Sequence, residues 1–460
     1  MDDTELLKQA RQVLDVNDMG IWTLPTSNGL YPHQWLWDAF FIAIGQRWYD
    51  VQRAKDEVWS PFRAQWHNGM VPHVIFGAGK GYHAGPALWQ CEVSPDAPKY
   101  IKTTGITQPP VAAEAVVRVG EVMSPEERRT WYREMYPRLL AWHQWFYRER
   151  GLGNGLVAVV LSWETGLDNS PPWLEIMRTH GMSRRVQAMK HLKLERFMEA
   201  RRKDTRVVPA AERMTTIDLN AVYDLIKNLR RLRYDSRQIM AKHPLRIADL
   251  TLNCVLMRAN VLLAEIAEEI GEGLPLDIRQ AIEQAPDALE SLWDEETSQY
   301  CCRDAVSGKL VKAPSIGGLL PLYAGQLPKA RAGALIKQLG DPHTFGAPYP
   351  VPSTPMNSPL FNPRRYWQGP SWVNINWLLM DGLRRNGHAD QAERLRRRTL
   401  AMIAGGGMYE YYSPLDGAPA GAGNFSWTAA LAIDLIKSAS SARALASTRG
   451  NRPTAFPLGT

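Results

Sequence analysis

The chain has 460 residues, 45% of them hydrophobic and 22% charged, with a formal net charge of +7 at pH 7. A chain of this length and apolar content buries one large core or two ordinary ones, which indicates a globular protein. No uncharged apolar run reaches about 18 residues, so we expect no membrane partner.

The beginning of the chain, MDDTELLKQARQVLDV, is charged and amphipathic. It lacks the apolar segment of a signal peptide, so we expect the protein in the cytoplasm. The four cysteines match neither a disulfide framework nor the CxxC spacing of a zinc site, and we expect reduced structural thiols. They are Cys91, Cys254, Cys301 and Cys302.

A 3.6-residue apolar period predicts about twelve helices. The clearest lies within residues 243–271, where Pro244 suits a first turn, apolar residues recur from Leu252 to Ile266, and Gly271 supplies a stop signal. The other predicted helices cover, in chain order, residues 4–15, 35–50, 109–122, 126–150, 185–202, 216–233, 276–295, 327–339, 371–386, 389–403 and 426–440.

Long connections rich in glycine, proline and aromatic residues separate these helices. Such loops in a compact domain are functional or disordered, and their many tryptophans argue against disorder. One hairpin is predicted in SQYCCRDAVSGKLVKA, because a Ser-Gly turn separates two β-prone runs. Residues 441–460 lack periodicity and predict a mobile tail. The long connections are 66–108, 151–182, 341–370 and 404–425.

The basic runs NLRRLRY and ERLRRRTL raise the question of nucleic-acid binding. Both lie on helical patterns whose arginines occupy the solvated face, and no nucleic-acid module accompanies them, so we expect no nucleic-acid partner. A small anionic substrate suits the same charge balance, because a weak basic field raises its local concentration.

Metal and cofactor motifs are missing from the sequence. The ten histidines show no HExxH spacing, and His33, His67 and His73 lie in aromatic loops where packing is the commoner fate. The stretch AGGGMYEYY lacks the preceding strand and the lysine of a phosphate-binding loop. We expect neither a metal nor a cofactor.

Tryptophan is the compositional outlier, with 17 residues. A single tryptophan is as readily a core aromatic as a binding residue, but here they gather beside carboxylates. Aromatic faces that stack on sugar C–H surfaces, with carboxylates between them that bind hydroxyls, form a monosaccharide pocket. Trp35 and Trp37 flank Asp38, Trp163 and Trp173 bracket Asp168, Trp367 and Trp372 lie in YWQGPSW, and Trp427 follows Glu410.

Eight motifs, spread over nearly the whole chain, carry a family resemblance. They are LYPHQWLWDAFF, QWHNGMVPHVIF, GYHAGPALWQ, TTGITQPPVAAEA, WETGLDNSPPW, DLTLNCVLMRANVLLAEIA, RRYWQGPSWVNINWLL and MYEYYSPLDGAPAGAGNFSWTAAL. Together they resemble glycoside hydrolase family 63, in the group of the bacterial mannosylglycerate and glucosylglycerate hydrolases, relatives of processing α-glucosidase I.

The resemblance implies an all-α fold, an (α/α)6 toroid of two concentric rings of six helices with the active site at one mouth. It implies one catalytic domain over residues 1–440, with loop and cap insertions at about 55–108 and 170–243. The twelve predicted helices agree in number with such a toroid.

The resemblance also implies an inverting reaction with two carboxyl groups. One protonates the leaving oxygen and the other deprotonates water, at a separation of about 6.5–9.5 Å. By motif, Asp168 is the general acid, kept protonated among tryptophans and prolines, and Glu410 is the general base. Glu164 stays open as an alternative acid, and Asp416 as an alternative base, although its SPLDGAP context suits a turn.

Further residues match substrate-binding positions of the similar hydrolases. Asp38 is implied to bind hydroxyls of the sugar, and Tyr82 and Gln108 to contact a glycerate leaving group. A glycerate carboxylate calls for an arginine, and Arg213 is the nearest equivalent of the family's cap arginine. Met214 and Leu219 replace the proline and tyrosine that accompany that arginine. The remaining predicted sugar-binding residues are Tyr31, Trp35, Trp37, Trp163, Gly166, Tyr366, Trp367, Trp372 and Trp427.

The predicted function is therefore hydrolysis of a small α-glycoside, glucosylglycerate or mannosylglycerate, to hexose and glycerate. Two alternatives stay open: an α-glucosidase acting on a kojibiose-like or trehalose-like disaccharide, and a catalytically silent sugar-binding toroid. The carboxyl pair favours an enzyme, since a binding module needs no separated acid and base. A homo-oligomer is possible.

Overall fold

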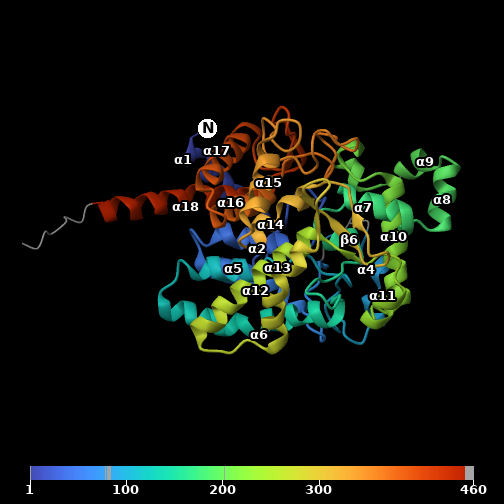
Figure 1. Cartoon of the computed structure of the whole chain (residues 1–460), viewed down its shortest axis with the longest axis horizontal. Helices are drawn as coiled ribbons and strands as arrows, with labels where there is room; N and C mark the ends of the chain where they lie inside the picture. The colour runs from blue at the N-terminus through green and yellow to red at the C-terminus, as the bar shows by residue number, and fades with distance from the viewer. Residues whose placement is uncertain (1, 78, 80–83, 201, 451–460) are drawn as a thin grey trace, which may run out of the picture.

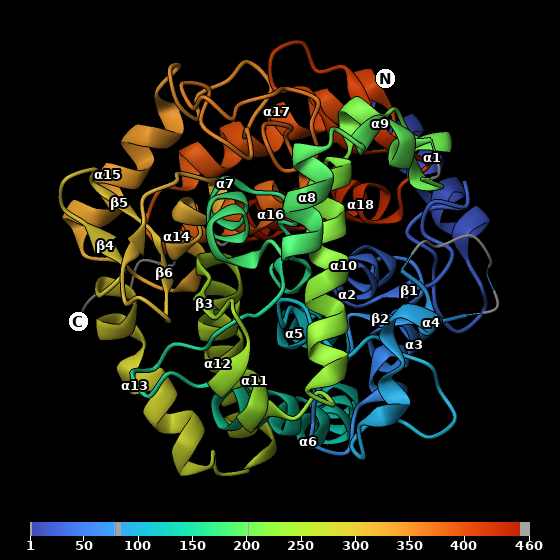
Figure 2. The same cartoon turned by 90° about the vertical axis from the view of Figure 1, so that its right-hand side faces the viewer.

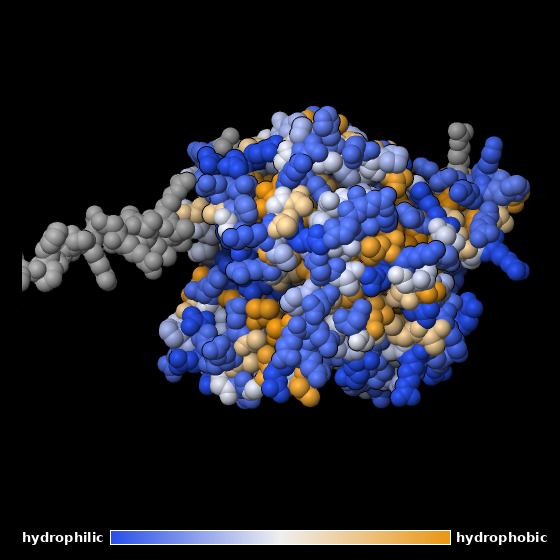
Figure 3. All heavy atoms as spheres, in the orientation of Figure 1, coloured by the Kyte–Doolittle hydropathy of each residue, from blue (hydrophilic) through white to orange (hydrophobic). Residues whose placement is uncertain are grey.

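The computed structural model describes residues 2–77, 79, 84–200 and 202–450, and over these residues the protein is mostly helical with four small antiparallel sheets (Figure 1). The face seen in Figure 3 is mainly hydrophilic, with apolar atoms in scattered patches. Inside, buried apolar residues form one continuous core that draws on nearly every helix.

Six helices form a ring around this core, each packed on the next, and the last returns to the first. The first is apolar all round and completely buried, as expected of a helix with neighbours on every side. In ring order they are α2 (Leu36–Gln46), α5 (Ala112–Gly120), α12 (Leu250–Ile270), α14 (Pro321–Ala324), α16 (Val373–Arg385) and α18 (Ser426–Gly450).

A second set of helices covers the ring from outside. Helix α1, for example, is amphipathic and buries Leu6, Ala10, Val13 and Leu14, which share one face. Helix α1 packs on α18, α3 on α2, α6 on α5 and α12, α13 on α12, and α17 on α16. The outer helices are α1 (Asp3–Asn17), α3 (Val51–Trp59), α6 (Pro125–Arg150), α13 (Leu276–Glu290), α15 (Lys329–Gly340) and α17 (Ala389–Gly406).

Five further helices form a cap at one end of the ring. Figure 1 shows α8, α9 and α10 at the right-hand edge, and Figure 2 shows α8 and α10 in front of the body. We call residues 171–242 the cap. Its helices are α7 (Pro171–Ile176), α8 (Arg184–His191), α9 (Glu195–Glu199), α10 (Thr216–Arg231) and α11 (Ser236–Lys242), and α10 also contacts α4 (Pro86–Trp89).

The strands are short, and they pair segments of the loops that connect the helices. The predicted hairpin is confirmed: β6 pairs antiparallel with β7 across Gly308, whose φ of 75° suits glycine. The pairs are β1 (Gln34–Trp35) with β2 (Val74–Ile75), β6 (Cys302–Asp304) with both β3 (Ile247–Ala248) and β7 (Leu310–Val311), β4 (Trp293–Asp294) with β5 (Gln299–Tyr300), and β8 (Tyr409–Tyr412) with β9 (Pro419–Gly423).

Several helix boundaries differ from the predictions. The helix predicted over 276–295 ends at Glu290, because Trp293 and Asp294 pair with β5. Pro244 is not in a first turn, because Ile247 and Ala248 pair with β6 and the helix starts after its N-cap Asp249. The helix predicted over 35–50 ends at Gln46, and α3 follows it unpredicted. The segment predicted as one helix over 185–202 forms α8 and α9. Helix α18 continues past residue 440 to Gly450, into the predicted tail.

The four cysteines are buried free thiols, as predicted. Among the described residues, α12 alone is long and apolar enough by composition to cross a membrane, and 83% of its apolar window is buried inside the protein. That burial is typical of a core helix.

Candidate active site

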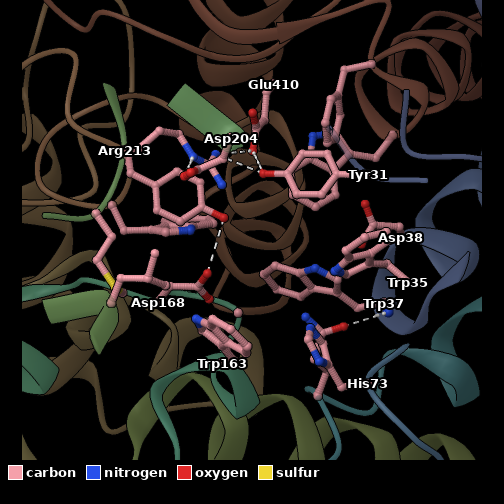
Figure 4. A pocket seen from close by; sticks show the side chains of 18 of the residues that line it. Tyr31, Trp35, Trp37, Asp38, His73, Trp163, Asp168, Asp204, Arg213 and Glu410 are labelled. Carbon is pink, nitrogen blue, oxygen red and sulfur yellow. Dashed lines mark hydrogen bonds and ion pairs between the residues drawn. The ribbon is translucent and has the colours of Figure 1, made fainter. Parts of the chain in front are cut away.

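A pocket opens at the capped end of the ring, and carboxylates, aromatic rings and two arginines line it (Figure 4). Inner helices begin at this pocket: Trp37 and Asp38 lie in the first turn of α2, Trp427 lies in the first turn of α18, and Gln108 precedes α5. Helix N-termini carry partial positive charge, so this end of the ring favours carboxylates and anionic ligands.

The loop WETGLDNSPPW is shaped to present Asp168 to the pocket. Gly166 has a φ of +73°, and a Cβ on it would lie 2.3 Å from the Trp37 ring, so only glycine fits. Asn169 Oδ1 accepts the backbone N–H of Trp367 at 2.8 Å, and α7 begins at Pro171. The residues around Asp168 therefore fix the loop on both sides of it.

Asp168 retains its proton near neutral pH. Burial raises its pKa to about 7, against the opposing effects of the Arg213 charge and a hydrogen bond from Tyr366. The Tyr366 hydroxyl lies 3.2 Å from Asp168 Oδ2. A carboxyl group that is protonated at pH 7 can donate a proton to a ligand.

Glu410 lies on β8 and points into the same pocket from the opposite wall (Figure 4). Tyr31 Oη donates to its Oε1 at 2.6 Å, and the backbone N–H of Ala422 donates to its Oε2 at 3.0 Å. Burial raises its pKa, whereas Arg213 and these hydrogen bonds lower it. Donors therefore surround Glu410, which suits an ionised carboxylate.

The two alternative carboxyls lie outside the lining. Glu164 is buried at the start of the Asp168 loop and does not line the pocket; it accepts the backbone N–H groups of Val160 and Leu161 and lies 3.7 Å from Arg150. Asp416 is exposed in a turn, where its side chain accepts the Ala418 N–H. Each has a structural explanation, in the loop and in the turn.

Aromatic rings form the pocket walls. Trp367 stacks on Trp372 with ring centroids 3.7 Å apart and planes 4° apart, so Trp372 supports the wall from behind and does not line the pocket itself. The structure brings twelve other predicted residues to the lining with Glu410. These are Tyr31, Trp35, Trp37, Asp38, Gln108, Trp163, Gly166, Asp168, Arg213, Tyr366, Trp367 and Trp427. Tyr82 lies outside the described residues.

The cap contributes two arginines, and both of them approach the same aspartate. Arg202 binds Asp204 through two contacts, of 3.1 and 2.6 Å, and Arg213 Nε lies 3.8 Å from Asp204 Oδ2. Arg213 Nη1 donates to Tyr31 Oη at 2.9 Å, and its guanidinium lies 4.3 Å above the centre of the Tyr366 ring. The three charged side chains are buried.

The lining also contains residues that sequence reasoning missed. Arg202 and Asp204 lie in a basic stretch typical of a solvated helix face, and no spacing signals their pairing. Burial lowers the pKa of His73 to about 3, so this histidine is neutral. Met214 and Leu219 were not predicted to line the pocket, because the sequence showed them only as replacements for a proline and a tyrosine of the similar hydrolases. The missed lining residues are His73, Arg202, Asp204, Met214, Leu219 and Phe425.

Within the described residues, no three His, Cys, Asp or Glu side chains gather in an arrangement that would hold a metal ion. The lining itself offers carboxyl, tyrosine and guanidinium groups.

Comparison with known proteins places these features in a family context. Residues 31–428 match the model of the mannosylglycerate hydrolase MGH1-like glycoside hydrolase domain. The chain is 37% identical to a mannosylglycerate hydrolase of Thermus thermophilus over 92% of this chain and 99% of that protein. It is 32% identical to a glucosylglycerate hydrolase of Mycolicibacterium hassiacum over 94% and 98%.

Solved structures of similar proteins support the same family. A crystal structure of a GH63 mannosylglycerate hydrolase from Thermus thermophilus in complex with Tris and D-glycerate has a TM-score of 0.84 at 36% identity, covering 94% of this chain and 100% of that one. The neutral trehalase Nth1 of Saccharomyces cerevisiae is similar in fold alone, with a TM-score of 0.58 at 16% identity over 96% and 84%.

Proposed function

The chain belongs to the MGH1-like glycoside hydrolases and is a glycosidase, and from its pocket we propose that it hydrolyses a small α-hexosylglycerate to hexose and glycerate. One observation carries this proposal. Asp168 and Glu410 are 242 positions apart in the sequence, yet they line a single aromatic pocket beside buried arginines. An acid, a base and a cation are the groups that this reaction needs.

In the proposed mechanism Asp168 is the general acid and Glu410 the general base. Asp168 gives its proton to the glycosidic oxygen as the bond to the anomeric carbon breaks. Glu410 takes a proton from water, which attacks the opposite face of the sugar ring. The raised pKa of Asp168, about 7, supports the first role. The donors around Glu410 support the second, because they stabilise a carboxylate.

The sugar is proposed to lie among the tryptophan faces, with Asp38 binding its hydroxyls. Asp38 lies in the first turn of α2 and points into the pocket beside Trp35 and Trp37 (Figure 4). The two oxygens of the Asp38 carboxyl group can accept hydroxyl hydrogen bonds, whereas Trp37, Trp163 and Trp427 offer apolar surface to the sugar C–H groups.

The leaving group is proposed to meet the cap. Arg202 and Arg213 are the guanidinium groups of the described lining, and Gln108 adds a neutral amide. We keep Arg213 as the cation for the glycerate carboxylate, because a guanidinium binds a carboxylate in the planar, two-point manner that glycerate offers. The D-glycerate in the similar Thermus structure supports this substrate class.

We further propose that the scaffold is an (α/α)6 toroid in a single catalytic domain over residues 1–440. The closed ring of α2, α5, α12, α14, α16 and α18 supports the inner circle. The six outer helices support the outer circle, and the fold similarity to a trehalase agrees with it. The cap corresponds to the predicted insertion at about 170–243.

The test compares two matched substrates, an α-hexosylglycerate and the corresponding α-hexosylglycerol, which lacks the carboxylate. An unpaired cationic pocket costs on the order of 2–5 kcal/mol, so kcat/KM should favour the glycerate by tens- to thousands-fold. Proton NMR should detect the β-anomer first, as inversion requires. Equal rates with both substrates would reject the glycerate pocket in favour of a disaccharide substrate, and no turnover of any α-hexoside would indicate a silent module.

A further inference from the structure

Tyr31 contacts both the base and the cap arginine. Its hydroxyl donates to Glu410 Oε1 at 2.6 Å and accepts from Arg213 Nη1 at 2.9 Å. The direct Arg213–Glu410 approach is longer, at 3.5 Å. Because a guanidinium has only donors, the single hydroxyl proton of Tyr31 must point to Glu410.

We propose that Tyr31 is a positioning residue for the base: its hydroxyl, oriented by Arg213, holds Glu410 in one orientation and in its ionised form. This inference rests on the proposed function, in which Glu410 deprotonates the attacking water. It gives Arg213 a role that does not depend on the leaving group.

Burial explains why the base needs such support. Tyr31, Arg213 and Glu410 are 8%, 7% and 1% exposed, and a buried carboxylate without donors would take up a proton. The Arg213 charge and two hydrogen bonds supply the compensation, one from Tyr31 to Oε1 and one from Ala422 to Oε2. Each oxygen keeps a second lone pair, which leaves an acceptor site for water.

The backbone on the other side of Glu410 prevents it from turning away. Gly421, with a φ of +72°, packs against the carboxylate so closely that a Cβ there would lie 2.6 Å from Glu410 Oε2. The base is therefore confined between β9 and the Tyr31 hydroxyl. Confinement on two sides restricts rotation of the side chain and keeps the carboxylate aimed at one point in the pocket.

The ring of Tyr31 is held independently of its hydroxyl. It makes edge contacts with Trp35 and Phe425, at centroid distances of 5.0 and 6.0 Å. A phenylalanine at this position retains these contacts and loses only the hydroxyl. Tyr31→Phe therefore separates the positioning role from the role of a pocket wall.

The test is the steady-state kinetics of Tyr31→Phe with the α-hexosylglycerate and with the neutral α-hexosylglycerol. We expect kcat to fall roughly 10- to 100-fold on both substrates, as for loss of a hydrogen bond to a charged group, with KM nearly unchanged. Tyr136→Phe removes a hydroxyl on the outer helix α6 that donates to Gly273 O, and it should leave kcat unchanged.

The pH profile gives a second readout that a structural role would not change. Losing the Tyr31 donor raises the pKa of Glu410, so the acid limb of kcat/KM should move to higher pH. Asp38 also influences this region, but it has no hydrogen bond to Tyr31 among those described. The titratable and charged groups that act on Glu410 are Tyr31, Asp38, Asp168, Arg213, Tyr366 and Tyr411.

Arg213→Lys is the second variant, and it matters if Tyr31→Phe fails to fold. A lysine keeps one charge but loses the planar fork, so kcat on the neutral glycoside should fall as well. A normal kcat for Tyr31→Phe, or a change in KM alone, would overturn the inference. If Glu410→Gln itself kept normal turnover, the proposed function would fail instead, so the two failures are distinguishable.

Discussion

Asp168 lies in a buried pocket, and burial disfavours the ionised form of its carboxyl group. Its neighbour Tyr366 occupies a left-handed backbone conformation with a φ of 45°, which is uncommon for a non-glycine residue. That conformation aims the tyrosine hydroxyl at Asp168 Oδ2. Both residues are held in energetically unfavourable states, as catalytic groups commonly are.

Asp168→Asn should therefore stabilise the protein while it abolishes general-acid catalysis. An unfolded aspartate ionises near pH 3.9, whereas folded Asp168 keeps its proton up to about pH 7. Between these values the folded state binds more protons, so stability falls as pH rises and the full cost persists above pH 7. Urea denaturation at pH 7.5 should show a gain on the order of 1–3 kcal/mol for the variant.

At pH 4 the wild-type carboxyl is protonated, so the same comparison should show little difference between the two proteins. Turnover of the variant should fall at least 10²-fold. An equal gain in stability at both pH values would mean that ionisation of Asp168 is not its cause.

Sequence reasoning located the two carboxyls because each lies in a distinctive local motif. Asp168 is surrounded by glycine, prolines and tryptophans, and the structure places it and Glu410 in one lining. Arg202 and Asp204 were missed because their pairing exists only in three dimensions. Trp372 was placed on the wall, but stacking behind Trp367 is a packing choice that composition does not reveal.

At the scale of elements, the closest helix contact in the ring is between α2 and α18. A Cβ on Gly45 would lie 2.3 Å from the Ala430 oxygen and 2.4 Å from its Cα, and both are backbone atoms. Gly45→Ala should therefore force the two helices apart and cost about 1–3 kcal/mol or more. Thermal unfolding measures this loss.

Gly333→Ala is the matched control. Gly333 lies in the outer helix α15, and nothing lies within 4 Å of a Cβ built there. Alanine has the higher helix propensity, so this variant should gain about 0.5–1 kcal/mol. A gain at Gly45 as well would show that α2 and α18 can separate at no cost.

Helix periodicity predicted most of the elements, because core-facing residues recur at the spacing that the ring demands. It failed where another partner competed for the backbone. Strand pairing of Ile247 and Ala248 delayed the start of α12 to Leu250. Between α8 and α9 the chain turns at Lys193, which has a φ of 54°. The apolar pattern continues through this turn, so it predicted one helix.

For the whole molecule, the ring is joined by buried charges where its first and last inner helices meet. Asp434 on α18 accepts the indole N–H groups of Trp48 and Trp377 at 2.9 and 2.7 Å and pairs with Arg47 at 2.8 Å. Trp48 and Arg47 follow α2, and Trp377 belongs to α16. One carboxylate thus connects three inner helices.

Asp434→Asn should destabilise the protein by about 3–5 kcal/mol, because the buried Arg47 loses its short ion pair. Glu296→Gln breaks a surface pair with Lys312, whose side chains are 80% and 45% exposed, and should cost less than about 1 kcal/mol. Urea denaturation of both variants tests the contrast. If Asp434→Asn lost no more stability than Glu296→Gln, the contact of α18 with α2 would depend on apolar packing alone.

The contact between α2 and α18 has a consequence for the newly made chain. Asp38 and Tyr31 leave the ribosome early, but Glu410, Trp427 and the helix that completes the ring come last. Until that final helix emerges, α2 lacks the neighbour against which it is buried, and before β8 emerges Asp168 lacks the carboxyl that faces it across the pocket. With the roles proposed for Asp168 and Glu410, a chain that stops before β8 lacks the proposed base, so we expect it to be inactive.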